Sequence, residues 1–445
     1  MIAGSKTRNV LWVILHTLVA LLGWVFLFPD AAQAAGSAGI EVGLDSAKAL
    51  GKGNAVVADP QDATTVVLNP AGLTRLEANQ MVLGTSVIVA TNEYHSVNGP
   101  AESGSVIPAF LPNFFLASNT PWDKLTMGLG VNSPFGAAPQ YESLGQFKYN
   151  GINSEVKMIA YTLAAAYEAT PWLSLGGGFS YADVDLRQIA KLNAAFISRN
   201  NGGAGTEPDV PTESDLEGKG MGWNAGFLLT PNDIWTIGLF YRSIVNAEMK
   251  GEYNADNLTG GVLPTIFGDS PSFRTSVDTD ITFPDSLSLG ANYRVNDDTD
   301  VEVDLTWTNW SMFDQFDWAY GKSNAVLDLN DPLKQEFQDT LSVNVGVSHR
   351  LNDIWTISGG YTFYEDASSV NKFENLFRDG DRHGIAAGVS YDRGNYTFAF
   401  AYSGQFVAEK EIENDLGTAT ASVSFDGKYK GFNHVMIASV VYRFQ

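Results

Sequence analysis

Polar and apolar residues alternate along much of this chain. Residues 300–307, DVEVDLTW, place acids and a threonine at one set of alternate positions and valines, leucine and tryptophan at the other. Residues 340–348, TLSVNVGVS, repeat the pattern. A period of two puts the two kinds of side chain on opposite faces of a β-strand. The pattern fits a soluble sandwich, whose apolar faces form a core, and also a membrane barrel, whose apolar face contacts lipid.

The lengths of the connecting segments favour the barrel. Short turns recur near residues 121–123, 170–172, 231–234, 296–299, 351–354 and 392–395. Long, polar, glycine-rich segments lie at residues 193–219, 254–276, 319–334, 365–382 and 409–428. Tight turns at one end and long loops at the other are typical of outer-membrane barrels.

Four tryptophans lie beside short turns, namely Trp122, Trp172, Trp235 and Trp355. Amphipathic rings at these positions are expected to anchor a barrel at the boundary between membrane and water. The alternative is that they are core aromatics at the ends of ordinary hairpins.

Fourteen alternating segments can be counted after residue 79. They span residues 80–91, 106–119, 125–136, 155–170, 173–192, 220–230, 235–253, 274–295, 300–318, 335–350, 355–364, 383–391, 396–408 and 429–444. Each reaches the roughly 9 to 11 residues that a tilted crossing needs, and bacterial single-chain barrels have an even number of strands. The sequence therefore predicts an all-β fold, a 14-stranded antiparallel transmembrane β-barrel over residues 80–445.

Residues 1–34 have the pattern of an export signal. Lys6 and Arg8 precede an apolar stretch at residues 10–28, and residues 32–34, AQA, match a signal cleavage site. We therefore expect the mature chain to begin at Ala35. The alternative is a membrane anchor, because the apolar stretch is about long enough to span a bilayer.

Residues 35–79 come between this signal and the first strand, and they do not alternate. Within them, Pro70 lacks the N–H that a regular ladder requires, and Asn69 carries an amide that can hydrogen-bond to an inner wall. A barrel this wide has a lumen that its own side chains do not fill. We predict that residues 35–79 form a plug, or hatch, inside the lumen.

Composition narrows the classes of function. A net charge of −23 disfavours nucleic acid as a partner, because phosphates would be repelled. The absence of cysteine argues against a small disulfide-stapled secreted domain. The four histidines after the signal lie in no known catalytic motif, and the acidic clusters at 297–300 and 379–381 fit solvated turns better than calcium sites. We predict no enzyme activity, no metal and no cofactor.

Several segments resemble the long-chain fatty acid transporter family of Gram-negative outer membranes, which also includes aromatic-hydrocarbon transporters. Residues 46–73, SAKALGKGNAVVADPQDATTVVLNPAGL, resemble the family's hatch segment. Residues 218–229 and 241–253 resemble its sixth and seventh strands, and residues 305–316, LTWTNWSMFDQF, resemble part of the next pair. The similarity covers nearly the whole chain after the signal.

The resemblance implies roles for two short motifs. Asn69-Pro70-Ala71 matches the hatch motif, and Pro134-Phe135-Gly136 matches the place where the third strand kinks and opens the barrel wall. Glycine weakens strand pairing and proline removes a ladder donor, so both residue types suit a broken wall. An ordinary strand end entering a loop is the alternative. We also predict that Asn69-Pro70-Ala71 contacts the inner wall near Gly136.

The chain departs from the family at the expected ligand site. Ser37 stands where fatty-acid members of the family have an aromatic residue. The family's basic residues near the bound carboxylate have no counterpart in register, although Arg187 and Lys334 are each one position away. Arg382 matches a family arginine but also fits an ion pair at a loop edge. A hydrocarbon without a carboxylate therefore stays open as the ligand.

The resemblance implies a monomeric transporter in the outer membrane of a Gram-negative cell. The expected function is passive uptake of long-chain fatty acids or other hydrophobic compounds, with capture by extracellular loops, rearrangement of the hatch and lateral exit into outer-membrane lipid. An apolar solute that leaves into lipid keeps its transfer free energy, whereas one that leaves into water loses it. A general porin and an outer-membrane adhesin or receptor are the alternatives.

Overall fold

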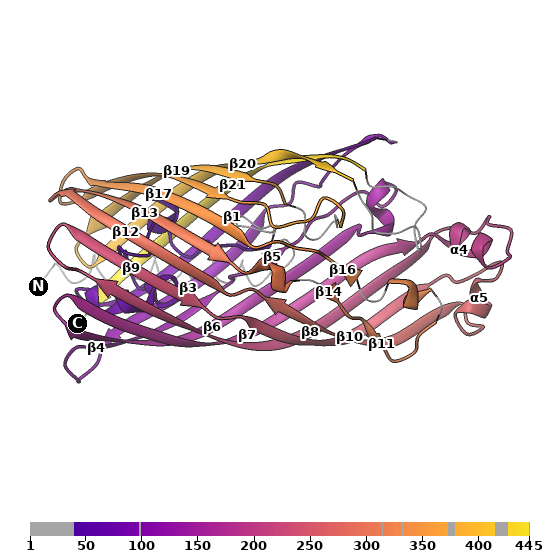
Figure 1. Ribbon diagram of the computed structural model, residues 1–445, viewed down its shortest axis with the longest axis horizontal. Coiled ribbons are helices and arrows are strands. Elements are labelled where there is room, and N and C mark those ends of the chain that lie inside the picture. The colour runs from indigo at the N-terminus through magenta and orange to yellow at the C-terminus, as the bar shows by residue number, and fades with distance from the viewer. Residues whose placement is uncertain are drawn as a thin grey trace, which may run out of the picture.

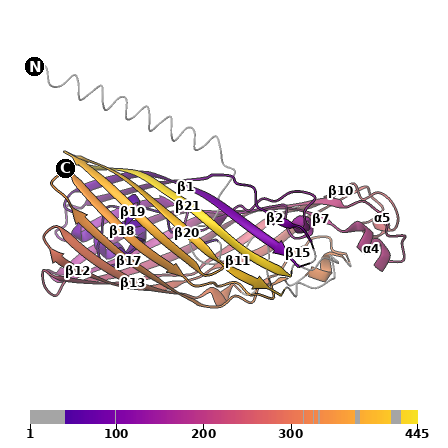
Figure 2. The same ribbon diagram turned by 90° about the horizontal axis from the view of Figure 1, so that it is seen from above.

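The computed structural model describes residues 40–444 except 98, 314, 325, 331–332, 373–378 and 414–425. The described chain forms a closed antiparallel barrel of 14 strands, as the sequence predicted. Figure 1 and Figure 2 show the strands wrapped around one long axis, with α4 (Ala194–Asn200) and α5 (Leu263–Ile266) at the end opposite the C-terminus. The predicted signal at residues 1–34 and Ser37 lie outside the described residues.

The wall strands follow one another in chain order, and three of them are divided into two pieces. The undivided strands are β1 (Asn79–Ser96), β3 (Ala109–Asn119), β6 (Asn153–Thr170), β7 (Leu173–Leu192), β8 (Val210–Leu229), β13 (Thr299–Thr308), β17 (Thr340–Arg350), β18 (Trp355–Tyr364), β19 (Arg382–Arg393), β20 (Tyr396–Ile412) and β21 (Gly427–Phe444). The divided strands are β4 (Leu125–Asn132) with β5 (Gly136–Ala137), β9 (Trp235–Arg242) with β10 (Val245–Asp256), and β11 (Ser272–Phe283) with β12 (Ser286–Asn296). The pairing of β1 with β21 closes the barrel, from Asn79 opposite Phe444 to Ser96 opposite Gly427.

Short elements occupy the segments between wall strands. They are β2 (Ala101–Ser103), η3 (Gln146–Tyr149), η4 (Trp310–Met312), β14 (Gln315–Phe316), β15 (Ala319–Tyr320), η5 (Leu327–Asn330) and β16 (Leu333–Lys334). Among the residues that the structure describes, no helix is long and apolar enough to cross a membrane.

The alternating pattern has become an apolar outer face and a more polar inner face. On β6, Tyr161, Leu163 and Tyr167 are exposed, whereas Thr162 and Ala164 between them are buried. Large exposed apolar side chains recur in this way along the wall, which is the surface that a transmembrane barrel presents to lipid. The four tryptophans beside the short turns are exposed as well.

The divided strands are the main local departure from the sequence prediction, which expected continuous strands at 235–253 and 274–295. Pro284 falls between β11 and β12, where it cannot supply a ladder N–H. Between β9 and β10 the Ser243 hydroxyl accepts the N–H of Trp223 at 2.8 Å, and so replaces a ladder carbonyl. Strand β13 also ends early, at Thr308 rather than at residue 318.

Residues 40–76, which we call the hatch, lie inside the barrel near the end that holds the C-terminus (Figure 1). They contain α2 (Ala47–Gly51), α3 (Thr65–Leu68) and the 3₁₀ helix η2 (Pro70–Arg75). The Ser46 hydroxyl accepts the N–H of Ala49 at the start of α2, and the Asn69 side chain accepts that of Ala71 at the start of η2. These caps satisfy helix donors that a short buried helix would otherwise leave without partners.

Lumen-facing glycines on eight wall strands make room for the hatch, and we call them the glycine belt. At each position an added Cβ would come within 3 Å of a hatch atom: Gly128, Gly176, Gly226, Gly238, Gly290, Gly346, Gly360 and Gly388. At Gly176 the nearest hatch atom is the backbone nitrogen of Ala71, 2.3 Å from such a Cβ. Because backbone atoms cannot rotate away, the belt fixes where the hatch lies.

Candidate functional site

Five aromatic side chains close the lumen on the side of the hatch that faces the long loops. We call Phe135, Phe283, Trp310, Phe313 and Phe337 the aromatic cluster, and none of them is more than 5% exposed. The ring of Phe135 lies 4.9 Å from Phe283 and 6.2 Å from Trp310, and Phe313 lies 5.2 Å from Phe337.

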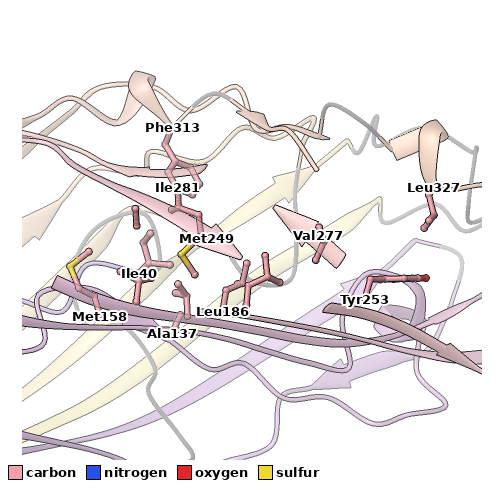
Figure 3. Close-up of a cluster of buried hydrophobic side chains, with 14 of the residues drawn as sticks. Ile40, Ala137, Met158, Leu186, Met249, Tyr253, Val277, Ile281, Phe313 and Leu327 are labelled. Atoms are coloured by element: carbon pink, nitrogen blue, oxygen red, sulfur yellow. The ribbon is translucent and has the colours of Figure 1, made fainter. Parts of the chain in front are cut away.

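The aromatic cluster belongs to a larger apolar region of the lumen. Figure 3 shows Met158, Met249, Ile281 and Phe313 directed toward one another from different wall strands and loops. All four are buried in the same hydrophobic cluster. The region offers apolar surface inside the barrel, on the path from the loop end to the hatch.

Phe135 enters the lumen because the third wall strand is broken. Strand β4 pairs with β6 as far as Asn132 opposite Ala160, and β5 resumes the pairing with Gly136 opposite Lys157. Residues 133–135 therefore lie opposite only residues 158–159 of β6, and one extra residue on one strand is the geometry of a β-bulge. The bulge directs the Phe135 side chain into the lumen, while the Phe135 carbonyl still accepts the N–H of Met158 on β6 at 3.0 Å.

Trp310 reaches the cluster through a second interruption. Where β13 ends, the backbone N–H of Asn309 donates to the Asp285 carbonyl at 3.0 Å, and the Asn309 side chain donates to the Asp285 carboxylate at 2.9 Å. These bonds bend the chain inward at the Pro284 break, and η4 then places the Trp310 ring inside with 0% exposure.

Pairing between β3 and the broken strand is interrupted. Strand β3 pairs with β4 only from Phe114 opposite Val131 onward, so its described residues 109–113 have no β4 partner. Contact between the two sides resumes where the Ser105 N–H donates to the Gln140 carbonyl at 2.8 Å. Pro134, Phe135 and Gly136, where the sequence predicts a lateral opening, lie beside this interruption.

The first described residues of the hatch pair with the broken strand. The N–H of Gly136 donates to the Ile40 carbonyl at 2.7 Å, and the N–H of Val42 donates to the Pro134 carbonyl at 2.9 Å. Glu41 lies between these bonds, opposite Phe135 in a β-bridge. Residues 40–42 thus act as a short extra strand on the broken edge.

The hatch motif lies elsewhere, so the predicted contact between Asn69-Pro70-Ala71 and the wall near Gly136 is wrong. The Asn69 amide donates to the carbonyls of Val57 at 2.7 Å and Phe227 at 3.4 Å. Ala71 lies against Gly176 of β7, and Asn69 against Gly226 of β8. The motif starts η2 and secures it to two wall strands, whereas residues 40–42 contact the broken strand.

A cavity of about 180 Å³ lies between the aromatic cluster and the hatch. The wall contributes mainly hydroxyl and amide side chains to its lining, among them Thr162, Ser180, Asn224, Ser288, Thr306 and Asn344. Phe135 forms part of the lining on one side, and Val56 and Val57 of the hatch form part of it on the other. At Phe135 the lumen thus changes from an apolar cluster to a cavity with a mixed lining of polar and apolar side chains.

A buried group of charges holds the hatch to β13. The Lys52 ammonium lies 2.7 Å from Asp59, 2.9 Å from Asp300 and 3.3 Å from Glu302. Burial alone would lower the pKa of Lys52, but these carboxylates raise it above its usual range, so the ammonium stays charged. The Asp304 carboxylate also accepts the N–H groups of Val56 and Val57, at 2.8 and 3.0 Å.

The three basic residues predicted near the ligand are not brought together. Arg187 is exposed on the outer side of the wall and pairs with Glu213 at 2.7 Å. Lys334 is described only through its backbone, which pairs with Gln315 in the short β14–β16 ladder. Arg382 is 3% exposed and pairs with Asp379 at 2.8 Å, while its Nε and Nη1 have no hydrogen-bond partner among the described residues.

Sequence reasoning singled out Phe135 but not the other four members of the aromatic cluster, and it did not single out Lys52 or Arg242. The Arg242 guanidinium pairs with Glu41 at 2.8 Å and lies 4.9 Å from the centre of the Phe135 ring. One signal was available for the cluster: alternation fails after Trp307, and Trp310 follows at a spacing of three. No local pattern marks Arg242 or Lys52, because Glu41 is distant in sequence from Arg242, and Asp300 and Glu302 are distant from Lys52.

Comparison with known proteins identifies relatives along almost the whole chain. The sequence model of the family described as "Outer membrane protein transport protein (OMPP1/FadL/TodX)" matches residues 30–444. The long-chain fatty acid transport protein of Escherichia coli strain K12 is 25% identical over 392 residues, which cover 80% of this chain and 84% of that protein.

Solved structures share the fold. A Pseudomonas aeruginosa FadL homologue superimposes with a TM-score of 0.81 at 19% identity, covering 92% of this chain and all of that chain. The Ralstonia pickettii toluene transporter TbuX gives a TM-score of 0.68 at 17% identity, covering 93% of this chain and 99% of that chain. Together with the family match, the 14-stranded barrel and its internal hatch show that the chain belongs to the FadL/TodX family of outer-membrane transport proteins.

Proposed function

We propose that this protein takes up hydrophobic molecules passively across the outer membrane and releases them sideways into lipid. The molecule enters from the long loops, binds at the aromatic cluster, and leaves through the opening between β3 and the broken strand. Residues 40–42 separate from Pro134-Phe135-Gly136 during this step. The substrate classes we propose are long-chain fatty acids, which the Escherichia coli relative transports by name, and monoaromatic hydrocarbons such as the toluene of TbuX.

One observation carries this proposal: the interrupted pairing lies directly beside the aromatic cluster, and Phe135 belongs to both. An apolar molecule bound at the cluster is therefore one side chain away from the edge of the wall. Residues 40–42 are bonded to that edge by two backbone hydrogen bonds. Two such bonds contribute only about 1 to 3 kcal/mol in net terms, which is small enough for a ligand to overcome.

Lateral release also agrees with the free energy of transferring an apolar cargo between environments. Each buried methylene contributes about 0.8 kcal/mol, and this free energy is kept only if the molecule moves from one apolar environment to another. The cavity beyond Phe135 has a mixed lining, in which the carboxylates of Glu41, Asp45 and Asp304 lie among apolar side chains. An apolar chain that enters it meets charged groups that lipid does not present, so exit toward lipid at Phe135 is favoured.

Within this scheme we propose that Asn69-Pro70-Ala71 keeps the hatch seated, and that Arg382 is the predicted basic residue that contacts cargo. Two nitrogens of its guanidinium group, Nε and Nη1, are buried without a partner among the described residues, and such donors favour an incoming polar group. We propose no catalytic step, no cofactor and no metal, and we propose that the monomer transports its cargo in contact with outer-membrane lipid.

A reversible disulfide between the hatch and the broken strand tests the lateral step. The chain has no cysteine, so Glu41→Cys with Phe135→Cys introduces a single pair at two positions that face each other in a β-bridge. Bridged positions are close enough for a disulfide. In cells that lack other routes for the substrate, we expect uptake of a fluorescent fatty acid to stop under oxidising conditions and to resume when the same cells are reduced.

Comparing the two redox states of one variant separates the effect of the disulfide from that of the substitutions themselves. The matched control is Ser288→Cys with Thr306→Cys, which joins two wall strands at positions that are already paired. Uptake in this control should not depend on redox state. Equal uptake by oxidised and reduced Glu41→Cys/Phe135→Cys protein would contradict lateral release.

A further inference from the structure

Arg242 is the only lysine or arginine among the residues that line the cavity, all of which lie in the described part of the chain. It is the last residue of β9, directly before the break at Ser243. That break places the Arg242 guanidinium against the face of the Phe135 ring, between the aromatic cluster and the cavity. A molecule that binds with its apolar part at the cluster would present its end group to this guanidinium.

Not every hydrogen-bond donor of the Arg242 guanidinium has a partner among the described residues. The guanidinium donates from Nη2 to the Glu41 Oε1 atom at 2.8 Å, and its Nε is buried without a partner among the described residues. Arginine has five N–H donors arranged to hold a carboxylate through two parallel bonds, and such paired bonds are stronger than a single one. A carboxylate that engaged both Nε and Nη2 would therefore take the position that Glu41 now holds through one bond.

Glu41 belongs to the segment that pairs with the broken strand. Its backbone faces Phe135, and the hydrogen bonds on either side of it join residues 40–42 to Pro134 and Gly136. Glu41 itself lines the cavity, so a second anion at the Arg242 guanidinium would be repelled by the Glu41 carboxylate at close range. Arrival of an anionic group at Arg242 therefore requires that Glu41 leave.

We propose that Arg242 binds the carboxylate end of an amphiphilic cargo, and that Glu41 occupies this site until the cargo displaces it. Displacement removes the side-chain contact that holds residues 40–42 against the broken strand, so binding of the end group and uncovering of the opening become one event. This inference rests on the proposed function and adds to it a carboxylate-ended substrate class and a way of regulating the opening.

Matched ligands that differ only in the end group test the proposal. Equilibrium binding of palmitate and hexadecanol is measured on the full-length protein in lipid nanodiscs. We expect the wild-type protein to prefer palmitate. Arg242→Gln should weaken palmitate binding at least about tenfold and change hexadecanol binding less than about twofold, because only the carboxylate uses the guanidinium. Glu41→Gln should tighten palmitate binding, because an uncharged amide competes with palmitate for the Arg242 guanidinium less well than the Glu41 carboxylate does.

A charge swap separates ligand binding from support of the fold. Glu41→Arg with Arg242→Glu restores an ion pair between the two positions but removes the cation at position 242. We expect the swapped protein to migrate as a folded, heat-modifiable barrel and to lose its preference for palmitate. Arg350→Gln, which removes an exposed arginine paired with Asp298, is the matched control and should leave both affinities unchanged.

The outcomes distinguish this inference from the proposed function. Equal loss of palmitate and hexadecanol binding in Arg242→Gln, or a swapped protein that still prefers palmitate, overturns the role of Arg242. Wild-type protein that binds both ligands without preference also overturns it and leaves uptake of uncharged hydrophobic molecules standing. Wild-type protein that binds neither ligand overturns the inference and the proposed function together.

Discussion

At the scale of single residues, the interior of this barrel is governed by polar groups that water cannot reach. Asp45 of the hatch is buried, and its carboxylate accepts a hydrogen bond from the Asn132 side chain at 2.7 Å. Burial raises the pKa of Asp45 from 3.8 to about 6, although the Asn132 hydrogen bond and the charge of Arg242 both oppose the rise. A raised carboxyl pKa means that the folded hatch binds the proton more tightly than the unfolded chain does.

This shift predicts that the hatch becomes more stable as the pH falls. Between about pH 6 and pH 4 the folded state holds a proton on Asp45 that the unfolded state has lost, so the free energy of unfolding decreases as the pH rises through this window. A shift of about two units corresponds to roughly 3 kcal/mol. Asp45→Asn, which cannot ionise, should therefore stabilise the hatch at pH 7 and have little effect at pH 4.

Hydrogen exchange of the amides in α2 measures this difference when mutant and wild type are compared at each pH. Asp123→Asn, in an exposed short turn, controls for the general loss of one negative charge. An Asp45→Asn effect of the same size at pH 4 and pH 7 would show that the carboxyl group is not the titrating group.

At the scale of elements, the hatch packs directly against the wall at the positions of the glycine belt. Gly176 and Gly177 are neighbours on β7 but face opposite sides of the sheet. A Cβ on Gly176 would lie 2.3 Å from the Ala71 nitrogen, whereas one on Gly177 would have only the Asn224 carbonyl within 4 Å, at 3.5 Å. The two positions therefore differ in contact with the hatch while sharing nearly the same strand environment.

We predict that Gly176→Ala dislodges η2 and that Gly177→Ala does not. The added methyl at position 176 would overlap backbone atoms of Pro70 and Ala71, so the hatch must move by about an ångström or more. Limited proteolysis should then cut within residues 65–76 of the Gly176→Ala protein, while the barrel keeps its heat-modifiable migration. Equal resistance of both variants to protease would mean that the belt does not hold the hatch in place.

The sequence predicts the wall better than it predicts the contacts inside it. Period-two alternation marks all 14 strands because each crosses from one aqueous side to the other with one face in lipid. The same alternation continues on both sides of Ser243 and Pro284, so it does not reveal that these strands are divided. The failure of alternation before residue 79 correctly indicates that this segment is not part of the wall.

The position of the hatch within the barrel could not be read in the same way. Asn69 contacts Phe227, and Glu41 contacts Arg242, across more than 150 residues of chain in each case. No periodic signal relates the register of the hatch to that of the wall, so the contact of Asn69-Pro70-Ala71 was assigned to the wrong strand. Arg242 and Lys52 become recognisable only when the folded chain brings their partners to them.

At the scale of the whole molecule, the barrel is a channel filled by its own N-terminal segment. The hatch packs against wall glycines on eight strands and is held to β13 by the buried Lys52 group. Between the hatch and the aromatic cluster lies the cavity of about 180 Å³. We therefore expect the hatch to determine how much of the lumen is open to ions.

Deleting residues 40–76 should convert the protein into a conducting pore. The wall hydrogen bonds from β1 to β21 do not depend on the hatch, so the barrel is expected to assemble. Its cross-section would then contain the space that the hatch now fills. In planar lipid bilayers, single-channel conductance should rise at least several-fold over that of the complete protein.

Heat-modifiable migration of the deleted protein checks that the barrel has closed. Full-length Gly177→Ala protein is a suitable control for the handling of a variant. Conductance equal to that of the complete protein, from a closed barrel, would mean that the loops rather than the hatch block the lumen.

The closing of β1 onto β21 also bears on how the molecule is made. The hatch is joined to the start of β1, and the wall surrounds it on all sides once that seam has formed. The hatch also carries a buried lysine that needs the carboxylates of β13 as partners. We therefore expect the nascent sheet to curl around the hatch while its edge strands are still apart, so that seating the hatch and sealing the seam are coupled steps of assembly.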